Sequence, residues 1–275
     1  MEKQSKHIFK EIIDNRKLIG SLARNDFKTK FAGSYLGIIW AFVQPVVTVL
    51  LYWFVFEVAL PQRALGRGSL SVPFVLWLIA GLVPWFFFSD CLSGGTAVLN
   101  EYNYLVKKVV FNIDILPVVK VLSAMFVHVF FVAFGMIIFA CMGFFPDLYY
   151  LQVIYYSFCI VVLVLGLTYL TGAVNVFFPD LRQVVNIGLQ IGIWMTPIMW
   201  NIDDMAKNIP GAVLVILKAN PMYYVVCGYR DSLTTGVGFW EKPGLTIYFW
   251  VVTIFIFALG TTVFKRLKVH FADVL

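Results

Sequence analysis

Charged residues are scarce in this chain of 275 residues. Asp, Glu, Lys and Arg make up 13% of it and hydrophobic residues 61%, whereas a soluble domain is about a quarter charged. Because a soluble protein needs polar side chains to cover its surface, the composition excludes an ordinary soluble globular domain. Lipid must cover much of this protein.

Motifs for common enzyme chemistry are also missing. The sequence has no Gly-Lys dipeptide, so it cannot contain the phosphate-binding GxxxxGK[ST] loop of an ATPase. HExxH and GxSxG are absent as well, and the three histidines are far apart in the sequence. We therefore expect this chain to have no catalytic residue, no metal site and no cofactor of its own.

Neither paired cysteines nor a signal peptide can be recognised. The four cysteines are scattered without a CxxC pair, which favours packing over metal or redox chemistry. The first thirty residues are charged and lack the apolar core of a signal peptide. We expect the N-terminus to stay in the cytoplasm, where it is made.

Long apolar segments dominate the rest of the chain. Six of them reach or approach the ~20 residues that a helix needs to cross a ~30 Å hydrocarbon core. Runs such as Phe130–Phe134 are apolar on every face, unlike the alternating strands of a β-barrel. The sequence predicts an all-α membrane protein with six transmembrane helices in residues 34–264, at 36–58, 72–88, 118–144, 151–174, 184–200 and 245–264.

Basic residues mark one side of the membrane. With the N-terminus inside, the cytoplasmic pieces are residues 1–35, the loop between the second and third spans, the loop between the fourth and fifth spans, and the tail 265–275. Together with their flanks they hold fifteen of the 21 Lys and Arg residues. This positive-inside pattern predicts a multi-pass protein with both termini cytoplasmic. The net charge of +6 then indicates topology and contact with anionic membrane lipids, and not nucleic-acid binding.

The N-terminal residues 1–33 form a separate segment. Within it, residues 5–31 place apolar groups on one side of a helix and charged groups on the other. Such a helix lies in the membrane interface and does not cross it. Two roles stay open, a simple lipid anchor and a docking surface for a partner.

Three connections have a recognisable pattern. Residues 100–110 contain helix formers and predict a short helix along the cytoplasmic face, and Pro179 marks a tight cytoplasmic turn. Residues 203–241 contain apolar pieces too short to span, broken at Pro210-Gly211 and Asn220-Pro221. They predict external re-entrant half-helices, with a small external cap as the alternative.

Three ionisable residues, Glu57, Asp90 and His128, lie in or near the spans. Such groups are costly in lipid and are often functional. A proton relay is one interpretation, but it needs several groups spread through different spans. The sequence favours a structural role, in which the carboxylates reach an interface and a neutral His128 bonds a neighbouring helix.

A set of short motifs runs through the chain in a fixed order: YLGIIW (35–40), QP (44–45), AGLVPWFF (80–87), LVKKV (105–109), ILP (115–117), TP (196–197), NPM (220–222), GYR (228–230) and HFADVL (270–275). By their order and spacing, they resemble the permease subunit of the ABC exporters for lipid-linked polysaccharides, namely O-antigen, capsular polysaccharide and wall teichoic acid. The likeness covers nearly the whole chain. It departs at Asn112, where the family usually has proline after phenylalanine.

The resemblance implies a homodimer of six-span subunits around a channel in the bacterial cytoplasmic (inner) membrane. A separate ABC ATPase chain, carrying ATP and Mg, would bind each cytoplasmic face. Coupling to it is implied for Glu101, Tyr102, Asn103, Leu105, Lys107, Lys108, Asp180 and Arg182. The re-entrant segment at the channel exit would include Asn220, Pro221, Tyr223 and Arg230.

The expected function is export of an undecaprenyl-diphosphate-linked polysaccharide. A glycan needs a polar or aromatic conduit, because each unpaired hydroxyl loses on the order of several kcal/mol in hydrocarbon. Candidate contacts are Arg24, Lys28 and Lys30 for the diphosphate, and Tyr35, Trp40 and Trp85 for the substrate. Anionic lipid heads are an equally good partner for the basic residues. The alternatives are a permease of the same architecture for drugs or small lipids, and a membrane-embedded glycan-modifying enzyme.

Overall fold

The computed structural model of this protein describes residues 13–30, 32–59, 72–107, 111–202 and 210–275. Within these ranges every regular element is a helix. Among the described residues, five helical segments are long and apolar enough to cross a membrane, and a bent pair makes a sixth if it counts as one span. The prediction of an all-α membrane protein is confirmed.

Five spans follow the predicted apolar segments, with changed bounds. The first combines a 3-10 turn at Gly37–Ile39, α3 (Trp40–Trp53) and a π-helical end at Phe54–Ala59. The other four are α4 (Phe74–Glu101), α6 (Leu116–Cys141), α7 (Gln152–Phe177) and α12 (Pro243–Lys268). Both α6 and α12 have a proline in their first turn, where its missing N–H costs no helical hydrogen bond.

The fifth predicted span, residues 184–200, is wrong in its extent. The helix there, α8 (Leu181–Met195), has 15 residues, fewer than the ~20 of a full span. It ends because Thr196 precedes a proline and is extended, with ψ 127°. The other candidate for a sixth span is the pair Gly211–Ala219, which is α10, and Pro221–Thr235, which begins with α11 (Pro221–Arg230). The pair is bent by 81°, as in a broken span or a re-entrant loop.

Helix α4 runs well beyond the end of the predicted span, to Glu101. Its added part contains polar and small residues among apolar ones, yet most of it is buried in the structure, and Thr96 is fully buried. Close packing on α7 explains this, since a Cβ at Gly95 would lie 2.2 Å from Thr168, and one at Gly172 would lie 2.9 Å from the Gly95 carbonyl oxygen. Hydropathy alone does not register a contact between two backbones.

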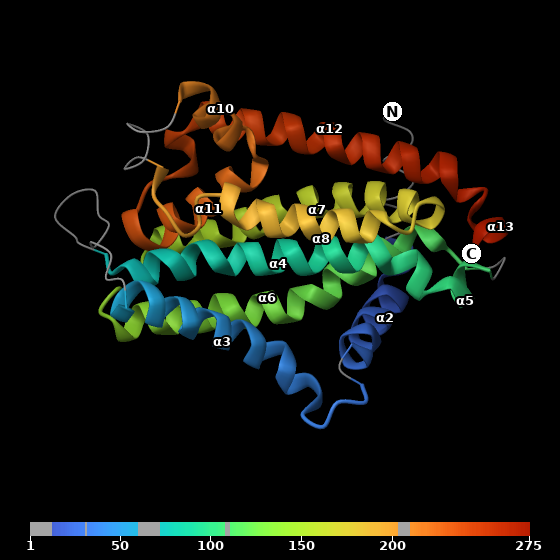
Figure 1. The fold of residues 1–275 in the computed structure, drawn as a ribbon, viewed down its shortest axis with the longest axis horizontal. Coiled ribbons are helices and arrows are strands. Elements are labelled where there is room, and N and C mark those ends of the chain that lie inside the picture. The colour runs from blue at the N-terminus through green and yellow to red at the C-terminus, as the bar shows by residue number, and fades with distance from the viewer. Residues whose placement is uncertain (1–12, 31, 60–71, 108–110, 203–209) are drawn as a thin grey trace.

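The long helices lie side by side in a bundle (Figure 1). At one end lie α10 and α11, and at the other lie α5 (Asn103–Val106) and α13 (Phe271–Val274). Helix α2 (Arg16–Thr29) is tilted and packs on α6 toward this second end. Eleven of the fourteen basic residues in the described ranges lie on α2, directly after it at Lys30, or toward this second end, which we call the basic end.

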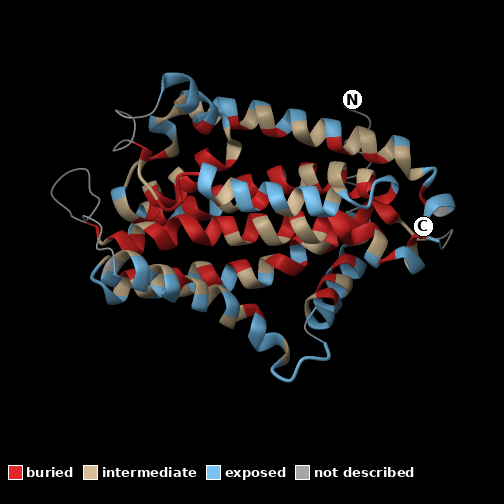
Figure 2. Ribbon diagram, in the orientation of Figure 1, coloured by how far each residue is buried: buried red, intermediate tan, exposed pale blue. Residues whose placement is uncertain are grey.

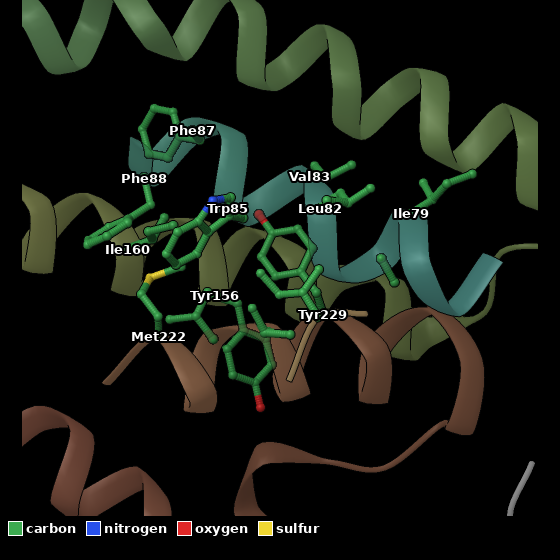
Figure 3. Close-up of a cluster of buried hydrophobic side chains, with 14 of the residues drawn as sticks. Ile79, Leu82, Val83, Trp85, Phe87, Phe88, Tyr156, Ile160, Met222 and Tyr229 are labelled. Carbon is green, nitrogen blue, oxygen red and sulfur yellow. The ribbon is translucent and has the colours of Figure 1, made fainter. Parts of the chain in front are cut away.

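Helix α4 is the buried centre of the bundle, whereas α3 is exposed or half-buried apart from Ala41 and Val49 (Figure 2). Figure 3 shows the core where Trp85 and Leu82 of α4 lie near Tyr156 of α7 and Met222 and Tyr229 of α11. Large apolar side chains cover the outer faces of α3, α6 and α12. Such faces suit lipid tails, which are as apolar as leucine.

The contact between α7 and α12 depends on a close backbone approach. A Cβ at Gly260 would lie 2.2 Å from the carbonyl oxygen of Gly166, and a backbone atom cannot rotate away as a side chain does. We expect Gly260→Ala to destabilise the protein by roughly 1–3 kcal/mol through overpacking, seen as a lower thermal midpoint in detergent. Gly244→Ala on the same helix is the control, because a Cβ there meets nothing within 4 Å. Equal midpoints for the two variants would contradict this account of the packing.

Candidate functional site

A groove of about 670 Å³ lies between α3, α4, α6 and α8. We call it the polar groove, because its lining includes seven uncharged polar residues, Gln44, Thr48, Ser89, Ser93, Gln183, Asn186 and Gln190. The three on α8 recur every three or four residues and therefore share one helix face. Across the groove, Ser93 Oγ donates a hydrogen bond to Asn186 Oδ1 over 2.9 Å. Polar side chains are thus gathered in one place within an apolar bundle.

Aromatic side chains complete the lining of the polar groove. They come from three helices and are Trp40, Trp85, Phe86, Phe87 and Phe131. Aromatic faces pack against the CH faces of a sugar ring, and amides and hydroxyls bond to its hydroxyl groups. The lining is suited to a neutral ligand rich in hydroxyl groups.

His128 lies at the buried wall of the polar groove. Its Nε2 is 3.0 Å from the Tyr229 hydroxyl and 3.2 Å from Ser157 Oγ, and its ring packs at a tilt against that of Phe87 with centroids 4.5 Å apart. Its Nδ1 has no hydrogen-bond partner among the described residues. The contacts to Ser157 and Tyr229 fit the structural role expected for His128, and Nδ1 is one more polar atom at the groove wall. The side chain of Glu57 lies outside what the structure describes.

A second cavity, of about 560 Å³, lies toward the basic end between α2, α4 and α6. We call it the basic-end cavity. Lys120 Nζ lies 2.7 Å from both Asp26 Oδ1 and Glu101 Oε2, and the Tyr102 hydroxyl donates to Asp26 Oδ1 over 2.7 Å. These four residues join α2 to α4 and α6. We call them the Lys120 network.

Tyr102 is a fixed donor in the Lys120 network. Burial of its ring, together with the hydrogen bond to Asp26, raises the pKa of the phenol well above its ordinary value. Its hydroxyl therefore keeps its proton across the physiological range. Tyr102 therefore stays a hydrogen-bond donor to Asp26 in this range.

The profile of the ABC-2 type transporter family matches residues 17–234, which include all four helices of the polar groove. This chain belongs to the ABC-2 type transporter family. It is 27% identical over 229 residues to the O-antigen export system permease protein RfbA of Myxococcus xanthus, covering 81% of this chain and 82% of that protein. To the RfbA protein of Klebsiella pneumoniae it is 24% identical over 260 residues, or 94% and 95% of the two chains. To the polysialic acid transport protein KpsM of Escherichia coli it is 23% identical over 246 residues, which cover 86% of this chain and 90% of that protein.

The predicted coupling residues of this ABC-2 transporter chain divide into two groups. Glu101, Tyr102 and Arg182 line the basic-end cavity. Asn103 and Lys107 are exposed and Leu105 is partly buried, on or beside the short helix α5, while Asp180 is exposed just before α8. Lys108 lies outside the described residues.

Three of the six substrate candidates line the polar groove, namely Lys30, Trp40 and Trp85. The other three do not contribute to it. Arg24 and Lys28 are exposed on α2, and Tyr35 is fully exposed in the connection to α3. The structure thus brings together one basic and two aromatic candidates.

Arg230 has a structural environment that the sequence did not suggest. Its buried guanidinium donates to the carbonyl oxygens of Pro197 at 2.6 Å and Ile198 at 2.8 Å, and stacks 3.2 Å above the Trp77 ring. It therefore fastens α11 to the segment after α8. Asn220 makes a second link there, because its Nδ2 donates to Thr196 Oγ1 over 2.9 Å.

The remaining predicted residues of the external segment have local roles. Pro221 is the first residue of α11, and the Asn220 side chain accepts from the next backbone N–H, that of Met222. Tyr223 is buried in a small apolar cluster with Ile202 and Leu217. Residues 203–209 of the predicted segment lie outside the described ranges.

Sequence reasoning missed Asp26, Lys120 and the amide residues of the site. Asp26 and Lys120 are 94 positions apart, so nothing in the sequence pairs them. The amides of α8 carried a usable signal, since polar residues at 183, 186 and 190 share a face inside an apolar segment. That face is the one that lines the polar groove.

We expect Lys120→Met to loosen α2 from the bundle. The substitution leaves Asp26 buried without its cation, and breaking a buried pair costs roughly 3–5 kcal/mol. Hydrogen exchange of the purified protein should then show faster exchange of the amides in residues 16–29. Lys107→Met is the matched control, because it removes a charge at the same end from an exposed side chain. Unchanged protection of α2 in Lys120→Met would contradict a linking role for the network.

Proposed function

We propose that this chain is the transmembrane permease subunit of an ATP-driven ABC exporter, which moves an undecaprenyl-diphosphate-linked polysaccharide outward across the bacterial cytoplasmic membrane. The observation that carries the proposal is the polar groove, with its uncharged polar and aromatic lining. A polymer rich in hydroxyl groups needs such partners, because hydrocarbon offers none. The relatives named for O-antigen export and polysialic acid transport favour this substrate class over drugs or small lipids.

In this proposal the basic end faces the cytoplasm, in accord with the positive-inside rule. A separate ATPase subunit, which holds ATP and Mg, docks on α5 and on the turn between α7 and α8. The exposed side chains of Asn103, Tyr104 and Lys107 support this placement. Movement of α5 would reach α2 and α6 through Tyr102 and the rest of the Lys120 network.

A second copy of the chain completes the channel. Helices α3 and α8 border the polar groove and expose large apolar side chains, which on α8 are Val184, Ile187, Ile191, Trp194 and Met195. A homodimer that covers these faces would enclose two grooves between its subunits. Membrane lipid covers the other outer faces, and α2 lies in the cytoplasmic interface.

The external half-helices α10 and α11 frame the exit of the channel in this arrangement. Arg230 and Asn220 fix them to the end of α8, so a displacement of α8 would carry the exit with it. Arg24 and Lys28 remain on the surface of α2, where they contact anionic lipid heads or the diphosphate of the carrier.

The proposal is tested by purification and by export in the same cells. The tagged chain should co-purify with a P-loop ATPase, and cells that depend on the chain should lose their surface polysaccharide when it is deleted. Thr48→Val and Gln190→Leu, which make the groove apolar, should lower export about tenfold without loss of the ATPase partner. Thr262→Val is the matched control, because Thr262 and Thr48 both bond the carbonyl four residues earlier. A chain that purifies alone and modifies a glycan by itself would refute the exporter.

A further inference from the structure

The polar groove and the basic-end cavity meet at one ion pair. Lys30 and Asp90 form a salt bridge, and both residues, with Ser93, line both spaces. Asp90 is eleven residues before Glu101 on α4, which places the pair about 16 Å deeper in the bundle than the end of that helix. The pair therefore lies at the boundary between the two spaces.

Charge changes sharply at this boundary. The basic-end cavity is lined by Asp26, Glu101, Lys120 and Arg182 in addition to the ion pair. In the lining of the polar groove, Lys30 and Asp90 are the two residues that carry a formal charge. A substrate with one anionic head and a neutral polymer would meet charged partners before the boundary and neutral partners after it.

The ion pair is also more easily broken than the network beside it. The Lys30 and Asp90 side chains are 44% and 37% exposed, against 13% for Lys120 and 7% for Asp26. An exposed pair gains little from its charges, because water screens both of them. A buried pair resists separation, since either partner alone would be an uncompensated charge. Of the two, the Lys30–Asp90 pair is the one suited to exchange partners.

We propose that the Lys30–Asp90 pair is a gate between the basic-end cavity and the polar groove, and that a diphosphate opens it by taking the place of Asp90 beside Lys30. Phosphate oxygens form strong charge-assisted bonds to an ammonium group, and the arriving negative charge repels the Asp90 carboxylate. The released carboxylate leaves the boundary open to the neutral polymer. The inference rests on the proposed function only for the identity of the anion.

The gate is tested by access of a reagent to a single cysteine. The reporter is Gln190→Cys, which lines the polar groove but not the basic-end cavity, in a chain whose four native cysteines are replaced by serine. The complete transporter with its ATPase is placed in inside-out vesicles and treated with a charged, membrane-impermeant thiol reagent. We expect Asp90→Asn to raise the labelling rate of the reporter at least fivefold. The double substitution Lys30→Asp with Asp90→Lys, which restores an ion pair, should return the rate toward that of the reporter chain with Lys30 and Asp90 in place.

A matched control is the ion pair of Lys242 and Asp231 at the opposite end of the bundle. Asp231→Asn should leave the labelling of Gln190→Cys unchanged. If Asp90→Asn also leaves it unchanged in a transporter that elutes as an intact complex, the gate is refuted. A reporter labelled at the full rate before any substitution would refute it as well.

The identity of the anion is tested with the reporter chain that keeps Lys30 and Asp90, to which three compounds are added separately. Pyrophosphate and farnesyl diphosphate should each raise the labelling rate, whereas vesicles enriched in phosphatidylglycerol should not. An equal response to phosphatidylglycerol would assign the site to bulk lipid and overturn the diphosphate as its ligand. The labelling assay does not depend on export, so the gate and the proposed function can fail separately. If the labelling rate responds to the diphosphates but the transporter exports no polysaccharide, the proposed function is contradicted and the gate remains supported.

Discussion

Hydrocarbon offers no hydrogen-bond partner, and this constraint accounts for most of the structure. The backbone satisfies it by forming helices over most of the described ranges. Polar side chains satisfy it by gathering, as Ser93 does with Asn186 and His128 with Tyr229. Even the buried guanidinium of Arg230 is held by backbone carbonyls. A hydroxyl-rich substrate faces the same constraint, and the polar groove is the place where this bundle can meet it.

Two kinds of contact divide the bundle into a rigid part and an adjustable part. Glycines let α7 approach α4 and α12 at backbone distance, and such packing leaves little room for movement. Helices α3 and α8 instead border the polar groove and expose apolar faces. In the proposed exporter, motion from the ATPase would act on these two helices through the basic end, while α4, α7 and α12 stay in place.

The sequence predicted what depends on local pattern and missed what depends on distant pairing. Hydropathy identified the all-helical membrane class, and the resemblance selected Lys30, Trp40 and Trp85, which line the groove together. The extent of α8 was wrong because Pro197 stops the helix although the apolar run continues. Neither the Lys120 network nor the Lys30–Asp90 pair could be read from the sequence, because their members are 60 or more positions apart or belong to different helices.

The central claim is that the polysaccharide passes along the polar groove. Its most direct test is a photo-crosslinking amino acid at position 190 in actively exporting cells, compared with the same residue at Val251 on the exposed face of α12. The account predicts covalent adducts with the polysaccharide at position 190 and adducts with lipid alone at position 251. Lipid adducts at both positions, with no polysaccharide at 190 during measurable export, would contradict it.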